Sequence, residues 1–190
     1  MTARPATVVG PVRFRRRSAP DTGVRDWLLS YIDQAFRDVS LELGMTIYAG
    51  EAMDRYGDDE ELRLSRQAER QDWRRVPPSC LHERPDALCY LDASAFRFYT
   101  PAIMSTVVRG EDLHGRLTDV FLWRLHGVSL RGEYDGGPYR QLFNRSQRAA
   151  VVRFLKYLSH NLRGGGDWVT PGTVEGLKQH GEAAHNGADA

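Results

Sequence analysis

One arginine lies inside the most apolar stretch of the chain. Arg97 stands between Phe96 and Phe98, and Tyr99 follows it by two residues. A guanidinium among aromatic residues needs a carboxylate, several carbonyl oxygens, an aromatic face or water at its head. If the segment is a strand, Arg97 and Tyr99 share one face, because strand side chains alternate with a period of two.

Asp72 and Asp92 are the acidic residues that we expect to meet Arg97. A structural ion pair would leave a buried carboxylate unpaired when Arg97 is replaced, whereas an open site would bind an anionic group of a ligand or partner. We prefer the ion pair, because no phosphate-binding loop lies nearby in the sequence. The candidate binding residues are Arg97, Tyr99, Asp72, Trp73, Asp92 and Asp54.

The familiar catalytic and metal-binding motifs are absent from the sequence. Cys80, His82, Cys89 and His114 could supply zinc ligands, but they lack the close pairs that zinc sites use. Neither a nucleophile elbow nor a phosphate-binding loop occurs, and Cys89 is expected to be an inert buried thiol. We therefore predict no metal and no cofactor, and the catalytic residues of any activity are unknown.

A second group of positive charges lies near the start of the chain, at Arg13, Arg15, Arg16 and Arg17. Such a cluster can bind the phosphates of a nucleic acid, but Phe14 is the only aromatic residue among these arginines. A solubilising tail is the more ordinary interpretation, so nucleic-acid binding is kept as an alternative.

The apolar stretch that contains Arg97 is predicted to form a β-hairpin. Two short β-prone runs, 88–92 and 96–100, are separated by three small residues. The segment 119–125 is apolar on both faces and is predicted to be a third strand. Thr100 and Pro101 have the residue types that begin a helix, which Gly110 should end.

Several helices are predicted around these strands. Apolar residues recur at steps of three and four over 24–39, which indicates an amphipathic helix. Thr46 should cap a short helix that ends at Gly57, and an acidic run from Asp58 should begin a third helix that ends before Pro77. The last helix is predicted over 145–162, where Asn144 and Gln147 have the spacing of a capping box.

These elements together predict an α+β fold. A small, mainly antiparallel sheet of about three strands would pack against four to five helices in a single domain. The domain should span residues 21–163, with a flexible Arg- and Pro-rich tail at 1–20 and a flexible Gly-rich tail at 164–190. The helices at 24–39 and 145–162 should cover the sheet.

Composition narrows the class of protein. The 190 residues include 26 basic and 25 acidic ones, so the net charge of +1 gives no general attraction to nucleic acids or anionic membranes. The longest apolar runs are far shorter than the roughly 18–20 residues that a membrane span needs, and the first residues lack the pattern of a secretory signal. Two cysteines are too few for a disulfide framework. We therefore expect a cytoplasmic protein.

A set of short motifs resembles a known family. They are Ala35-Phe36, Ala52-Met-Asp-Arg-Tyr56, Asp72-Trp73-x-x-Val76-Pro77, Leu91-Asp92-x-x-x-Phe96-Arg-Phe98-x-x-Pro101-Ala102, and Gln147 followed by Phe154-Leu155-x-Tyr157-Leu158. This order is similar to a family of uncharacterised bacterial proteins, domain of unknown function six-seven-one-four, over roughly residues 24–162. The family pattern has a glycine where this chain has Ala95. If the loop at this position is left-handed, alanine would cost about 1 kcal/mol relative to glycine. The resemblance implies membership and transfers no catalytic residues.

Three classes of function remain open. The absence of a catalytic constellation beside a well-patterned core favours a non-enzymatic protein-interaction module, of an immunity, defence or assembly type, whose partner is another protein. The alternatives are a small enzyme that uses Arg97 with Asp54, Asp72 and Asp92, and a nucleic-acid binder that uses Arg13–Arg17. The sequence predicts no membrane partner and leaves the oligomeric state open.

Overall fold

The computed structural model describes residues 15–16, 22–55, 59–112, 115–131, 133–134, 137–138 and 142–163. The predicted tails, 1–20 and 164–190, lie outside these residues except for Arg15–Arg16.

Helices make up most of the described chain. In order they are α1 (Thr22–Ala35), α2 (Ile47–Asp54), α3 (Asp59–Gln67), the 3₁₀ helix η1 (Trp73–Arg75), α4 (Pro78–Glu83), the 3₁₀ helix η2 (Asp86–Cys89), α5 (Ala93–Arg109), α6 (Arg116–Arg131) and α7 (Arg145–Asn161). The strands are two residues long: β1 (Arg15–Arg16), β2 (Glu133–Tyr134), β3 (Gly137–Pro138) and β4 (Leu162–Arg163). They form two antiparallel pairs, β1 with β4 and β2 with β3.

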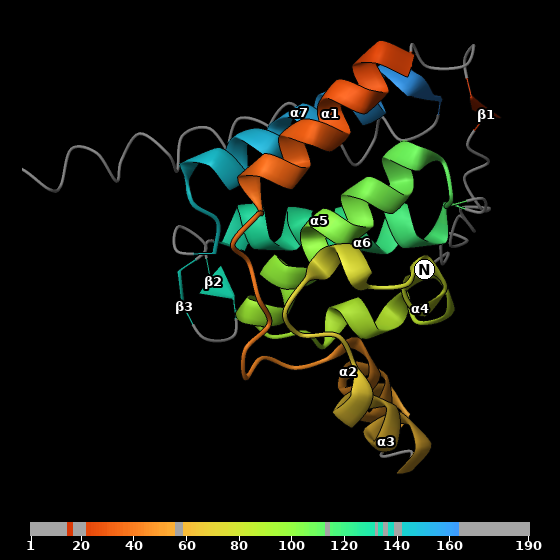
Figure 1. The fold of residues 1–190 in the computed structure, drawn as a ribbon, viewed down its shortest axis with the longest axis vertical. Coiled ribbons are helices and arrows are strands. Elements are labelled where there is room, and N and C mark those ends of the chain that lie inside the picture. The colour runs from red at the N-terminus through yellow and green to blue at the C-terminus, as the bar shows by residue number, and fades with distance from the viewer. Residues whose placement is uncertain are drawn as a thin grey trace, which may run out of the picture.

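Helix α5 lies at the centre of the fold, between the other helices. In Figure 1, α1 and α7 run side by side above α5 and α6, while α2 and α3 project at the far end of the molecule. A row of aromatic contacts joins these layers. Phe96 of α5 packs against Phe121 of α6 and against Phe143, and Phe143 meets Phe36 edge-on at 6.0 Å.

The predicted α+β class is wrong. Residues 93–100, expected to be the hairpin loop and second strand, belong to α5. The expected first strand, 88–92, runs from the end of η2 through a short connection to Asp92, the N-cap of α5. The expected third strand, 119–125, belongs to α6. Ala95 is therefore in the first turn of a helix, and the left-handed loop considered for it does not form.

The error has a physical cause in the burial of α5. Every residue from Phe98 to Val108 is buried, so this part of the helix has no solvent-facing side, and the contrast between faces that gives an amphipathic helix its period of 3.6 is weak. A buried helix and a buried strand cannot be separated by the period of a short apolar run. Pro101, expected to begin a helix, lies inside α5, where Thr100 donates a hydrogen bond to the Phe96 carbonyl.

The predicted helix ends are confirmed where side chains cap the backbone. The Thr46 hydroxyl accepts a hydrogen bond from the Ala49 amide at the start of α2. Asn144 and Gln147 form a reciprocal capping box at the start of α7, at 2.9 and 3.1 Å. Gly110 ends α5 with a left-handed φ of 79°.

Two predicted helices are shorter in the structure than in the sequence analysis. Helix α1 ends at Ala35, and the chain turns before the buried side chain of Val39. The expected helix from 58 to 75 is divided into α3 and η1. Among the described residues, no helix has both the length and the apolar character that crossing a membrane requires.

Candidate functional site

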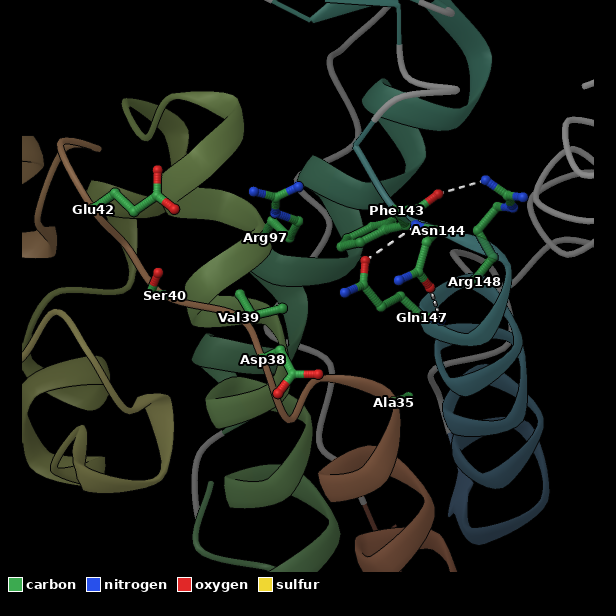
Figure 2. Close-up of a pocket in the computed structure, with 10 residues that line it drawn as sticks. All are labelled: Ala35, Asp38, Val39, Ser40, Glu42, Arg97, Phe143, Asn144, Gln147 and Arg148. Atoms are coloured by element: carbon green, nitrogen blue, oxygen red, sulfur yellow. Dashed lines mark hydrogen bonds between the residues drawn. The ribbon is translucent and has the colours of Figure 1, made fainter.

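A pocket of about 390 Å³ lies where the end of α1, the following connection, α5 and the start of α7 meet. We call it the Arg97 pocket. Its charged lining residues are Asp38, Glu42, Arg97 and Arg148, and its polar ones are Ser40, Asn144 and Gln147. Both signs of charge therefore meet in one cavity, as Figure 2 shows.

Arg97 reaches this pocket from the side of the central helix. Its guanidinium lies between the segment that carries Glu42 and the start of α7 (Figure 2). The Arg97 Nε is buried and has no hydrogen-bond partner, and within the described part of the chain no ion pair holds the guanidinium. A buried donor without a partner is costly, so the pocket presents an unfilled requirement for an acceptor.

The opposite wall of the pocket comes from the connection after α1. Glu42 adopts a positive φ of 50°, a left-handed conformation that costs an L residue about 1 kcal/mol. Arg70 holds this conformation, because its guanidinium donates to the carbonyls of Glu42 and Gly44 at 2.9 and 3.0 Å. The Leu41 amide also donates to the Arg70 carbonyl at 2.7 Å. The wall is thus fixed by contacts from a distant part of the chain.

The third wall is the first turn of α7. The capping box of Asn144 and Gln147 fixes the start of this helix, and Arg148 donates to the carbonyl of Phe143. A helix N-terminus carries partial positive charge, which adds to that of Arg97 and Arg148. The carboxylates of Asp38 and Glu42 supply the opposite charge. The cavity can therefore hold an anionic group beside a cationic one.

The structure gives Asp72 and Asp92 partners other than Arg97. Asp92 caps α5 by accepting from the Ala95 amide at 2.8 Å, and it also accepts from the Met45 amide at 2.7 Å. Asp72 caps η1 and pairs with Arg74 at 3.0 Å. These two carboxylates hold loops in place, and neither lines the Arg97 pocket.

Trp73 and Asp54 also lie apart from Arg97. Trp73 is buried, and its indole N–H donates to the Phe36 carbonyl at 2.9 Å. Asp54, near the exposed end of α2, accepts a hydrogen bond from the Tyr90 hydroxyl at 2.8 Å. The three carboxylates Asp54, Asp72 and Asp92 therefore do not converge on one point.

Tyr99 faces a different cavity from Arg97. Two residues along a helix differ by about 200° in direction, so the shared face expected for a strand does not exist. Tyr99 lines a cavity of about 510 Å³ with Cys80, Glu69 and Arg70. Its hydroxyl accepts from the Ile47 amide at 3.1 Å, and burial raises the pKa of Tyr99 well above its usual value. The phenol stays protonated at neutral pH.

The cysteine and histidine residues considered as zinc ligands do not form a metal-binding cluster within the described part of the chain. Among the described residues, no group of three or more histidine, cysteine or acidic side chains lies close enough to hold a metal ion. Cys80 is buried and takes part in no disulfide among the described residues, and burial raises the pKa of the partly exposed Cys89. His114 lies outside the described residues.

The arginines near the start of the chain are described only in part. Arg15–Arg16 form β1, which pairs antiparallel with Leu162–Arg163 directly after α7. Arg13 and Arg17 lie outside the described residues.

Sequence reasoning missed Asp38, Glu42 and Arg148 as neighbours of Arg97. They lie 59, 55 and 51 residues away along the chain, in a connection and in another helix, so no local spacing links them to it.

The comparisons with known proteins add one finding. No curated protein and no solved structure gives a significant match to the chain. The model of a family of unknown function, DUF6714, matches residues 24–163, which include all four charged residues of the Arg97 pocket. The resemblance seen in the motifs is confirmed, and this chain belongs to the DUF6714 family of unknown function.

Proposed function

We propose that this protein is a non-enzymatic interaction module that recognises a partner protein through the Arg97 pocket. The observation that carries the proposal is the Arg97 guanidinium, which lines an open cavity while its buried Nε has no acceptor among the described residues. A carboxylate of the partner can accept two parallel hydrogen bonds from such a guanidinium. Binding would therefore satisfy a group that the free protein leaves unsatisfied.

The acidic residues of the pocket give this recognition a second requirement. Asp38 and Glu42 would repel a partner that offers only negative charge, and they would attract a basic group next to its carboxylate. The expected partner surface thus carries an acidic and a basic side chain side by side. Opposed charges of this kind contribute more to the choice of partner than to affinity.

An enzyme built on separated carboxylates has less support. Asp54, Asp72 and Asp92 each contact a different group, a tyrosine hydroxyl, an arginine and two backbone amides respectively. Acid–base catalysis needs such groups within hydrogen-bond reach of one substrate. The binding interpretation requires no rearrangement of these three residues.

Affinity capture with matched variants tests the proposal. The baits are the wild-type chain, Arg97→Met and Arg109→Met, where Arg109 is an exposed arginine at the end of the same helix. Cross-linked extracts of the native host should yield a protein that wild type and Arg109→Met retain and Arg97→Met loses. Thermal melts of the three baits check that all are folded.

The retained protein is then purified and titrated against each variant. Loss of a charged hydrogen bond should weaken binding by Arg97→Met by about 10- to 100-fold. Replacing an acidic residue of the partner's contact surface should weaken its binding to the wild-type chain by the same factor. It should not weaken its binding to Arg97→Met any further. Equal affinity of all three variants would contradict the proposal, as would a catalytic turnover that depends on Arg97.

A further inference from the structure

The other end of the α1–α7 pair carries a groove of about 280 Å³ whose chemistry differs from that of the Arg97 pocket. Its floor contains Val24, Trp27, Leu28 and Tyr157. Its charged and titratable lining residues are Arg153, Lys156 and His160, and no acidic side chain lines it among the described residues. We call it the α1–α7 groove.

Trp27 is the most exposed aromatic side chain of this groove. It is 53% exposed and packs against Tyr31 with a ring separation of 5.7 Å. The Arg153 guanidinium lies over the other ring of this pair, 4.3 Å from the centre of Tyr31. The result is a fixed aromatic platform with a cation beside it, which suits a flat ring.

The charge of α7 extends along the whole helix. The segment 142–163 contains four arginines, one lysine and one histidine, and it contains no aspartate or glutamate. Within the described residues, no carboxylate pairs with Arg153 or Lys156, whereas the nearby Asp26 of α1 pairs with Arg25 at 3.6 Å. A net charge of +1 over the whole chain hides this local excess.

The pairing of β1 with β4 brings a distant segment of backbone to the same end of α7. The backbone of Arg15 lies opposite Arg163, and that of Arg16 lies opposite Leu162. Leu162 directly follows Asn161, which lines the groove. The backbone of Arg15–Arg16 is therefore attached directly after the helix that lines the groove.

We propose that the α1–α7 groove binds single-stranded nucleic acid, with one base stacked on Trp27 and the phosphates following the cations of α7. An aromatic platform beside a row of cations is the usual arrangement for strands bound without sequence preference. The groove is slightly smaller than the roughly 300–1,000 Å³ of drug-sized sites, so it fits a flat ring better than a folded peptide. The site is independent of the Arg97 pocket.

Fluorescence anisotropy with a labelled oligothymidylate of about 12 nucleotides tests this assignment, a length within the range that such sites cover. Wild type should bind, and its affinity should fall about 7- to 20-fold between about 50 and 200 mM salt, as two or three phosphate contacts from Arg153, Lys156 and His160 predict. Trp27→Ala should bind about 10- to 100-fold more weakly because the stacked base is lost. The matched control is Trp123→Ala, since Trp123 of α6 is 52% exposed and lies outside the groove.

Further variants separate the possible outcomes. Lys156→Gln should reduce the steepness of the salt dependence, and Arg97→Met should leave oligonucleotide binding unchanged. No binding by wild type overturns the proposal, and so does equal binding by Trp27→Ala and Trp123→Ala. Displacement of the oligonucleotide by polyglutamate at equal charge also overturns it, because that result would mark the groove as a site for an acidic protein. If Trp27→Ala does not fold, the test rests on Lys156→Gln. A salt dependence of oligonucleotide binding equal to that of wild type then rejects the site.

Discussion

At one end of the α1–α7 pair, acidic and basic side chains share a pocket of about 390 Å³, whereas at the other end cations alone surround an apolar groove of about 280 Å³. Arg148 and His160, which mark the two ends, are 12 residues apart, or about 18 Å along a helix. Three distant elements build the pocket, and two neighbouring helices build the groove. The antiparallel packing of α1 and α7 thus keeps two cavities of different charge apart by most of the length of a helix.

The two ends also differ in how firmly they are attached to the core. The pocket end contains Phe36 and Phe143, which are buried and in contact, and a loop fixed by Arg70. The groove end shows the half-exposed side chains of Val24 and Trp27 to the solvent. Substitutions of the buried aromatic residues at the pocket end should therefore lower stability more than substitutions of the half-exposed residues at the groove end.

The largest expected difference is between Trp27 of α1 and Phe36, which directly follows that helix. Phe36→Ala should lower the free energy of unfolding by about 3–5 kcal/mol, because it removes a fully buried ring. Trp27→Ala should lower it by about 1 kcal/mol or less, because half of that side chain is already in water. Chemical denaturation measures both values. Similar losses would show that the groove end is as much a part of the core as the pocket end.

The asparagines of α7 give the next comparison. Asn144→Ala removes the capping box and should cost about 1 kcal/mol. Asn161→Ala removes one hydrogen bond, from its amide to the Tyr157 carbonyl, at the other end of the helix. It should cost a few tenths of a kcal/mol, as partly exposed positions usually do. Thermal melts rank the two, and a larger loss for Asn161→Ala would reverse the comparison.

Glu42 tests the strain in the wall of the pocket. Glu42→Gly should be about 1 kcal/mol more stable than Glu42→Ala, because only glycine adopts a φ of 50° without cost. Both variants lose the carboxylate, so their difference isolates the backbone conformation. Equal stabilities in urea denaturation would mean that the loop relaxes when the side chain is removed.

Arg97 should show the smallest effect on stability. Arg97→Met is expected to leave the free energy of unfolding unchanged or to raise it by less than about 0.5 kcal/mol, because it strands no carboxylate and removes a buried Nε that has no acceptor among the described residues. Arg109→Met is the control on the same helix. If Arg97→Met loses several kcal/mol of stability and Arg109→Met does not, Arg97 forms the structural ion pair that the sequence analysis preferred.

The sequence determined the features that depend on near neighbours. Thr46, Gly110 and the pair Asn144 and Gln147 begin or end helices through contacts within one turn, so their residue types were sufficient. The family was also readable, because its motifs are runs of local sequence.

Only the tertiary structure decided the class of the fold and the surroundings of Arg97. Helix α5 has no solvent-facing side from Phe98 to Val108, and that burial weakens the periodicity by which a helix is recognised in a sequence. Asp38, Glu42 and Arg148 meet Arg97 because α1 packs against both α5 and α7, and nothing in the spacing of these residues encodes that packing. Contacts across more than 50 residues depend on how whole helices pack, which a local pattern does not record.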